Sequence, residues 1–366
     1  LLYCDRMRLL LAVILAAPLA AAVSLPPSDE PTADEVAILE LMNRFRADPK
    51  AETKRILEDP RVPSYMWRGV DRAMFQRECE ALPAVPPLAF DLDALRSARR
   101  HSVYMIHNGL GHDEQAGKEG FSGVKFSDRM KAAGFSGSPG GENCFLEASD
   151  PWVSHCGFII DYGPGGAGGM QPDRGHRMNM ANGRFTVVGP SAVPHGSRIS
   201  VTHNFGTVKT RFAGGAVFSD RNGNGIYDVG EGRGGVEVRS ADGKLSTRTW
   251  ASGGYVLAIP SAVGGIEFRI GDLVHQVAVG TGSENVHLTW AVPAAEELAL
   301  CDRLIAAVEA IPDEERHQDR RRKAVTDLWV ATRTLDLDSP RTQRVEVLTA
   351  TVAADLDGVT VCDDAG

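Results

Sequence analysis

The chain changes its residue pattern twice, and this division constrains the fold more than any other feature. In the first part, up to about residue 207, helical periodicities come first and two strand-like segments follow them from about residue 184. From Arg211 glycine and valine become frequent and short strand patterns follow one another, and after Pro293 the pattern is helical again. A chain of 366 residues is too long for one ordinary domain, so two or three are expected.

The first part predicts helices followed by a small sheet. Thr32 and Glu35 fit a capping box before a helix that ends at Asp48-Pro49. The proline-rich segment 50–87 predicts a looped insertion with short helices. Later helices are predicted from Asp91 to about His107, over Asp128–Ala133 with Ser127 as its cap, and from the Asp150-Pro151 pair. The segments Arg184–Val193 and Ile199–Phe205 predict strands, so this domain is α+β.

The second part predicts an antiparallel β-sandwich, and the third part a helical domain. Short strands at close spacing, separated by turns such as Asp242-Gly243, are typical of a sandwich. The predicted strands are Gly215–Ser219, Gly235–Ser240, Leu245–Trp250, Tyr255–Ile259, Ile266–Ile270, Leu273–Val279 and Val286–Trp290.

Composition argues against a nucleic-acid-binding protein. The net charge is −9, and the basic footprint of such proteins is missing. The basic run Arg320–Lys323 follows several acidic residues and is interpreted as a solvated helix face. No segment after residue 22 is apolar and long enough to predict a membrane span.

The first 22 residues predict a signal peptide. A short basic start at Met7-Arg8 precedes an apolar run from Leu9 to Ala17, and small residues follow up to Ala22. We therefore expect an exported protein, extracellular, on the cell surface or in the periplasm. The alternative is an uncleaved amphipathic or buried N-terminus.

The cysteine count fits an exported chain with one thiol left over. Cys4 precedes Met7 and would be lost, which leaves five. We expect the disulfides Cys144–Cys156 and Cys301–Cys362, with Cys79 unpaired. The alternative is that all are buried, reduced thiols.

Three blocks between residues 111 and 180 pair glycine with histidine or a carboxylate. They are Gly111-His112-Asp113-Glu114, Gly140-Gly141-Glu142-Asn143-Cys144 and Gly175-His176-Arg177-Met178-Asn179-Met180. Histidine together with a carboxylate serves general acid–base chemistry and divalent-metal binding.

Together with the His101-Ser102 helix and the strand Phe185–Gly189, these blocks resemble the bacterial branch of the CAP superfamily, the SCP-like (cysteine-rich secretory, antigen 5, pathogenesis-related) domain. The resemblance covers roughly residues 30–207 and implies a three-layer α–β–α sandwich. It also implies a surface cleft of two histidines and two acidic residues. His112, Glu142 and His176 match three of them, and Asp161 is the nearest carboxylate for the fourth place, where the family usually has a glutamate.

The cleft residues allow three interpretations. Two imidazoles and two carboxylates suit Zn²⁺ or another divalent ion, with His112 and His176 as ligands. The same side chains could transfer protons, or could hold loops by hydrogen bonds alone. His101, as a lone helical histidine, is interpreted as a packed core residue.

The resemblance favours an extracellular binding domain, with a lipid, peptide or cell-surface component as its partner. The alternative is a secreted metal- or acid–base-dependent hydrolase, most plausibly a peptidase, that uses the same cleft. No GxSxG, HExxH or papain-like pattern is present, so the sequence offers no obvious nucleophile.

A second constellation lies near the start of the predicted sandwich. Oxygen-bearing residues and one backbone carbonyl fit the twelve-residue calcium pattern, with Gly225 at position six. They are Asp220, Asn222, Asn224, Ile226 (carbonyl), Asp228 and Glu231, at positions one, three, five, seven, nine and twelve. Because strands flank the loop, the combination resembles the SdrD B-like calcium-loop modules of bacterial surface proteins. The alternative is an Asn/Gly-rich turn without an ion.

The predicted organisation is therefore a signal peptide over 1–22, a CAP domain over 30–207, a β-sandwich with a Ca²⁺ loop over 211–291 and a helical domain over 294–366.

Overall fold

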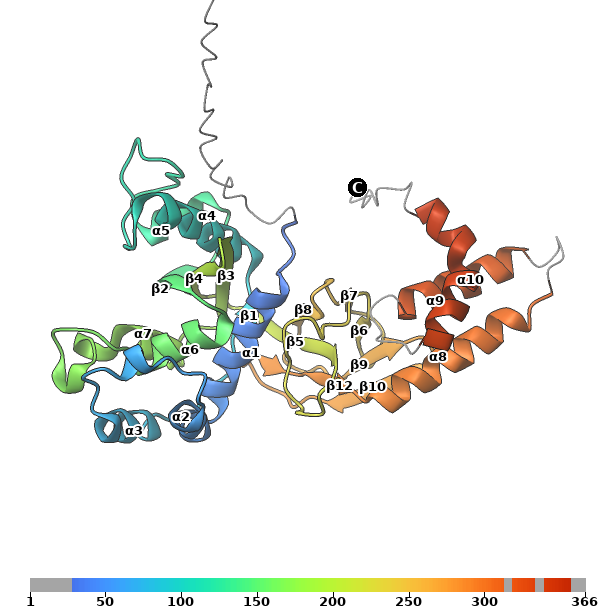
Figure 1. Ribbon diagram of the computed structural model, residues 1–366, viewed down its shortest axis with the longest axis horizontal. Helices are drawn as coiled ribbons and strands as arrows, with labels where there is room; N and C mark the ends of the chain where they lie inside the picture. The colour runs from blue at the N-terminus through green and yellow to red at the C-terminus, as the bar shows by residue number, and fades with distance from the viewer. Residues whose placement is uncertain (1–27, 313–317, 333–338, 357–366) are drawn as a thin grey trace, which may run out of the picture.

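The computed structural model describes residues 28–312, 318–332 and 339–356 (Figure 1). The predicted signal peptide, Cys4 and Cys362 lie outside these residues. Within the described part of the chain, no helix is both long and apolar enough to cross a bilayer.

The first helices begin where their caps predict. In α1 (Ala33–Ala47) Thr32 Oγ1 accepts from the amide of Glu35 at 3.3 Å, and Glu35 Oε2 accepts from the amide of Thr32 at 2.8 Å. This is the predicted capping box. The segment up to residue 87 holds the predicted short helices α2 (Pro49–Glu58), η1 (Ser64–Trp67) and α3 (Arg72–Glu80).

A four-stranded sheet forms the middle layer of the first domain. Its strands are β1 (Ala89–Phe90), β2 (Ser138–Ala148), β3 (Val187–His195) and β4 (Arg198–Thr207), in the order β1-β3-β4-β2. Helices α4 (Leu92–Asn108) and α5 (Phe126–Ala132) lie on one side, and α1, α6 (Pro151–Ile160) and α7 (Gly175–Met180) on the other (Figure 1). The predicted α–β–α sandwich is confirmed.

Strand β2 begins at Ser138, so Glu142 lies inside it. One local prediction in this domain is wrong. Ser127 is not a cap, because α5 begins at Phe126, two residues before the predicted start at Asp128. The amide of Lys125 donates to the Asp128 carboxylate at 3.4 Å, so Asp128 performs the capping.

The second part is a β-sandwich of two sheets that share a core. One sheet has the order β10-β9-β6-β7, and in the other β5 pairs with β8, β11 and β12. The strands are β5 (Arg211–Ser219), β6 (Glu237–Ser240), β7 (Ser246–Arg248), β8 (Gly254–Ile259), β9 (Gly265–Ile270), β10 (Leu273–Ala278), β11 (Val286–His287) and β12 (Trp290–Val292).

The predicted strand 286–290 is divided into β11 and β12, and both pair with β5 in parallel rather than antiparallel. The division lies where the chain crosses Gly215. A Cβ at this glycine would stand 2.4 Å from the carbonyl oxygen of Leu288, and its φ is +151°. Glycine therefore permits the close approach that separates the two short strands.

Strand β5 joins the two domains because both of its faces are buried. Val217 packs into the core of the sandwich, whereas Phe218 packs into the first domain's core together with Val36 of α1 and Tyr227. After the sandwich come α8 (Ala294–Glu309), α9 (Gln318–Thr332) and α10 (Ser339–Leu356). These helices share a small apolar cluster of their own.

The predicted disulfide Cys144–Cys156 is wrong. Both residues are free, buried thiols, as is Cys79. Cys144 lies on β2 beside His112, whereas Cys156 belongs to α6 and packs in the core below the opposite face of the sheet. Cys301 is buried in the cluster of the C-terminal helices, and its predicted partner Cys362 is outside the described residues.

Candidate functional site

Strand β2 carries the centre of the candidate site. Side chains alternate between the two faces of a strand. Glu142 therefore faces α4, where its carboxylate lies 3.8 Å from Nε2 of His101. The side chain of Asn143 faces the other side, where its Nδ2 donates to the carbonyl oxygen of His176 at 3.1 Å. Cys144, two residues after Glu142, again faces α4.

The first histidine–carboxylate pair is His112 and Glu142. Nδ1 of His112 lies 3.1 Å from Glu142 Oε1 and 3.6 Å from Cys144 Sγ. The His112 side chain is 56% exposed, whereas that of Glu142 is 1% exposed. The hydrogen bond with Glu142 raises the pKa of His112 against the effect of burial.

Glu142 remains a carboxylate despite its burial. Burial raises its pKa, but the hydrogen bond from His112 and the nearby charges of His101 and Arg129 outweigh that effect and hold the pKa below its usual value. Nη2 of Arg129 donates to Glu142 Oε2 at 2.6 Å. Glu142 is therefore an anion that lies between the buried guanidinium of Arg129 and the accessible imidazole of His112.

The second pair is His176 and Asp161. Nδ1 of His176 donates to Asp161 Oδ1 at 2.9 Å, while Asp161 Oδ2 accepts from the backbone amides of His176 at 3.1 Å and Arg177 at 3.3 Å. Asp161 is fully buried and ends α6 with a left-handed φ of 57°. This backbone turn directs its carboxylate at the start of α7.

Both histidines are held in the same manner. Each presents Nδ1 to a buried carboxylate, which keeps the proton on Nδ1 and leaves a lone pair on Nε2. Within residues 28–312, neither Nε2 has a hydrogen-bond partner.

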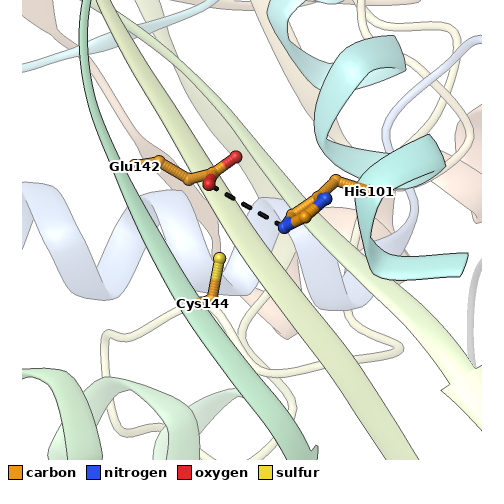
Figure 2. Close-up of side chains that lie close together, drawn as sticks. All are labelled: His101, Glu142 and Cys144. Carbon is orange, nitrogen blue, oxygen red and sulfur yellow. Dashed lines mark ion pairs between the residues drawn. The ribbon is translucent and has the colours of Figure 1, made fainter. Parts of the chain in front are cut away.

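The four predicted side chains form two pairs rather than one group. Among the described residues, the group of three His, Cys, Asp or Glu side chains whose ligand atoms lie within 4.8 Å of one another is His101, Glu142 and Cys144 (Figure 2). Its histidine is already engaged, because Nδ1 lies 2.9 Å from Glu114 Oε1 and Nε2 lies 2.9 Å from the carbonyl oxygen of Gly111. Both ring nitrogens already face an oxygen atom, so neither is open to a metal ion.

Two residues of this buried network were not recognised in the sequence. Arg129 lies between Glu142 and Glu114, with its Nε 3.5 Å from Glu114 Oε1. Glu114 also accepts from the amide of Ser122 at 2.6 Å. The Gly-His-Asp-Glu block contains Glu114 and could have indicated it. Arg129 gave no signal, because an arginine in a short helix is usually solvated.

A pocket of about 300 Å³ opens beside β2. Cys144, Phe145 and Leu146 of the strand line it together with Tyr162, Gln171 and His176. His112 contacts the same Cys144. The two histidine–carboxylate pairs therefore flank one segment of the edge strand.

The predicted calcium loop folds back on its own side chains. Asp220 accepts from the amides of Asn224 at 3.0 Å and Gly225 at 2.9 Å. The side-chain amides of Asn222 and Asn224 both donate to Asp228 Oδ2, at 2.8 and 2.7 Å. Positions three, five and nine of the calcium pattern thus converge on one point.

The last position of the pattern closes this loop. Glu231 is 7% exposed and accepts from the amides of Arg221 at 3.1 Å and Asp228 at 3.3 Å. Tyr227 anchors the middle of the loop, because its hydroxyl donates to the carbonyl oxygen of Ser252 at 2.8 Å. The loop is therefore tied to the core that α1 and β5 share.

Comparison with known proteins identifies the first domain. Residues 39–207 match the model of the family described as CAP, Cysteine-rich secretory protein family. A crystal structure of an extracellular protein containing a SCP domain from Bacillus anthracis str. Ames also matches, with 23% identity over 41% of this chain and a TM-score of 0.27. The match covers 45% of that protein's chain, less than half of its length. No curated protein matches the chain. Residues 39–207 thus form a CAP domain.

Proposed function

We propose that the CAP domain binds an extracellular ligand at the pocket beside β2, with two histidines as the residues that contact it: His176, which lines the pocket, and His112, which lies beside the pocket residue Cys144. The observation that carries the proposal is the state of the two imidazoles. Each has Nδ1 fixed by a buried carboxylate and an Nε2 without a partner among the described residues. Rings held in this way are prepared to accept a proton, a hydrogen bond or a metal ion at Nε2.

A divalent ion such as Zn²⁺ fits this donor set. Neutral imidazole is a favoured zinc ligand, and a carboxylate on the other ring nitrogen is its usual supporting partner. Nε2 of His112 and of His176 would hold the ion. When bound, the ion supplies a positive centre for an oxygen atom of the ligand, while Glu142 and Asp161 orient the rings.

Binding is favoured over hydrolysis by the chemistry of the neighbouring side chains. Burial, followed by the charge of Glu142, raises the pKa of the Cys144 thiol well above its usual value, so it is not a thiolate at neutral pH. The buried Ser102 hydroxyl is bonded to Ser191 and Thr202, at 2.7 and 2.9 Å. Neither residue is suited to nucleophilic attack.

The test is a calorimetric titration of the full chain with Co²⁺ and with Zn²⁺. His112→Ala and His176→Ala should each weaken binding at least tenfold. His107→Ala is the matched control, because His107 also lies near a carboxylate (Glu119, 3.6 Å), but that carboxylate is exposed rather than buried. Unchanged affinity in both cleft variants would contradict the proposed metal site.

We also propose that the loop from Asp220 to Glu231 binds Ca²⁺ and that residues 211–291 are a SdrD B-like module. Its support is the donor set, since oxygen-bearing side chains at positions one, three, five, nine and twelve suit a hard cation. Asn222 and Asn224 direct their amides at Asp228, so rotation of each amide group would present an oxygen there instead. We further propose that residues 1–22 are a signal peptide that directs export, that the CAP domain extends over residues 30–207, and that residues 294–366 form a helical domain.

A further inference from the structure

The outer edge of β2 has backbone groups that point away from the sheet, and the prolines of β3 show which ones they are. In an antiparallel pair, alternate residues bond to the partner strand and the others face away. Pro190 and Pro194 lie opposite His203 and Ile199 of β4. Proline has no N–H to give to a ladder, so both must belong to the set that faces away from β4. The carbonyl of Val188, in the same set, accepts from Asp91 on the far side at 3.0 Å.

This register fixes the direction of the backbone groups in β4 and β2. Because Pro190 does not bond to His203, the N–H and C=O of His203 face β2, where its partner is Asn143. Glu142 and Cys144, on either side of Asn143, must then direct their N–H and C=O outwards. The Glu142 carbonyl agrees with this, because it accepts from the Asn179 side chain of α7 at 3.4 Å.

The N–H and C=O of Cys144 therefore point outwards from the edge of the sheet, and Cys144 lines the pocket together with Tyr162 and His176. Asn179 covers the edge on one side of this residue. On the other side the ladder is interrupted between Phe145 and Ala148, where Glu147 has a left-handed φ of 66°. The open edge is thus short, and it is centred on Cys144.

We propose that the ligand of the site is an extended peptide that adds to this edge as a further strand. A donor and an acceptor held side by side on a strand edge are complementary to the acceptor and donor of one peptide residue. This inference rests on the ligand site proposed above and names the chemical class of its ligand. The peptide residue opposite Cys144 directs its side chain to the face of His112, and the residues beside it direct theirs to the face of His176.

The two faces differ, so the site should prefer different side chains at successive positions of the peptide. On the face of His176, the pocket wall includes the apolar surfaces of Phe145 and Tyr162, which favour an aliphatic or aromatic side chain. On the other face, the accessible imidazole of His112 lies beside Cys144, and it favours an acidic or hydrogen-bonding side chain there.

The first experiment screens a positional-scanning library of capped pentapeptides against the full chain by fluorescence anisotropy. The best sequence is then made with each amide N-methylated in turn. N-methylation at the residue opposite Cys144 should reduce affinity about tenfold or more, since a hydrogen bond is lost and the strands are held apart. Methylation of its two neighbours, whose N–H groups face away, should be tolerated. Equal effects at all positions would overturn strand addition.

Amide hydrogen exchange of the protein gives an independent readout. Adding the best peptide should slow exchange at Cys144, whereas Asn143, already paired with His203, should change little. Cys144→Pro removes the donor and should abolish binding, and Cys144→Ala keeps it and should bind peptide. Protection of Cys144 that depends on protein concentration without peptide would identify a second copy of the chain as the occupant and overturn the peptide.

Failure of this inference is separable from failure of the metal proposal. If no peptide binds but Co²⁺ binds and is lost in His176→Ala, the peptide inference is wrong and the metal site stands. Alternating N-methyl effects in a protein that binds no metal would support the peptide edge and contradict the metal role. If neither probe binds, both proposals fail.

Discussion

Asp161 holds His176 by its ring and by its backbone at once. Oδ1 accepts from the imidazole at 2.9 Å, and Oδ2 accepts from the backbone amide of the same residue at 3.1 Å. A glutamate was expected at this place from the family resemblance, and aspartate is one methylene shorter. The left-handed turn at Asp161 brings the backbone close enough for the shorter side chain to make both contacts.

Asp161→Asn should therefore weaken metal binding without removing a metal ligand. An amide in place of the carboxylate no longer holds the proton on Nδ1 and allows the other tautomer of His176, and loss of such a partner commonly costs about 10- to 100-fold in affinity. Titration with Co²⁺ measures the change. Asp173→Asn is the control, because Asp173 is exposed and has a similar φ of 58°. Equal affinities in the two variants would show that Asp161 does not orient a metal ligand.

Glu142→Gln should lower the pKa of His112. The hydrogen bond and charge of Glu142 raise that pKa in the folded protein. A raised folded pKa contributes stability that is fully present below the unfolded value of about 6.5 and is lost as pH rises through the folded value. The variant should lose this contribution, and its His112 ring resonance should titrate at lower pH by NMR. An unchanged His112 titration would contradict the pairing, with the His107 resonance as an internal reference.

Arg129→Met should strongly destabilise the chain. It leaves the buried carboxylates of Glu142 and Glu114 without their shared cation. Breaking a buried ion pair on one side costs about 3–5 kcal/mol, to be measured by urea denaturation of the full chain. Lys125→Ala, which removes an exposed ion pair with Asp113, should change stability little. A similar small effect for both variants would mean that Glu142 or Glu114 is neutral in the folded protein.

His203→Leu should reduce the amount of stability that the chain loses as the pH becomes acidic. His203 is fully buried between Phe158 and Phe205, and neither ring nitrogen has a hydrogen-bond partner. Burial, with the nearby His155 and His176, lowers its pKa from 6.5 to about 3. Between pH 6.5 and about pH 3, His203 therefore binds a proton in the unfolded chain but not in the folded chain. As the pH falls through this range, this residue lowers the free energy of unfolding by about 1.4 kcal/mol per pH unit.

The measurement is urea denaturation at pH 7, 6, 5 and 4. The wild type should lose stability more steeply than His203→Leu below pH 6.5, and the exposed-helix variant His107→Leu should follow the wild type. Parallel curves for wild type and His203→Leu would mean that His203 is protonated within the fold.

The sequence was sufficient where the determinants are local. Thr32, Asp91 and Asp150 cap helices as their patterns predicted, because a cap needs only the next three residues. The segment 199–205 also lies in a strand, β4, as its pattern predicted. These features depend on the residues of one turn or one strand.

The remaining features depend on contacts between distant segments. Arg129 is defined by two carboxylates on other elements, and Cys144 and Cys156 are kept apart by the sheet between them. The outward backbone groups of Cys144 follow from a proline two strands away. No local pattern encodes such relationships, so only the folded chain reveals them.

Calcium should stabilise the chain through the loop after β5. Ca²⁺ that binds only the folded protein raises stability by RT ln(1 + [Ca²⁺]/Kd), about 2.7 kcal/mol at a hundredfold excess over Kd. Glu231→Gln should abolish this increase in Tm, since it removes the charge at the closing position. Because Glu231 also accepts two backbone amides in the ion-free loop, the informative quantity is the shift in Tm between Ca²⁺ and chelator for each variant. Asp242→Asn, in an exposed turn of the same sandwich, should keep the full shift. A wild-type Tm that is identical in Ca²⁺ and in chelator would exclude calcium and leave the loop as an Asn/Gly-rich turn.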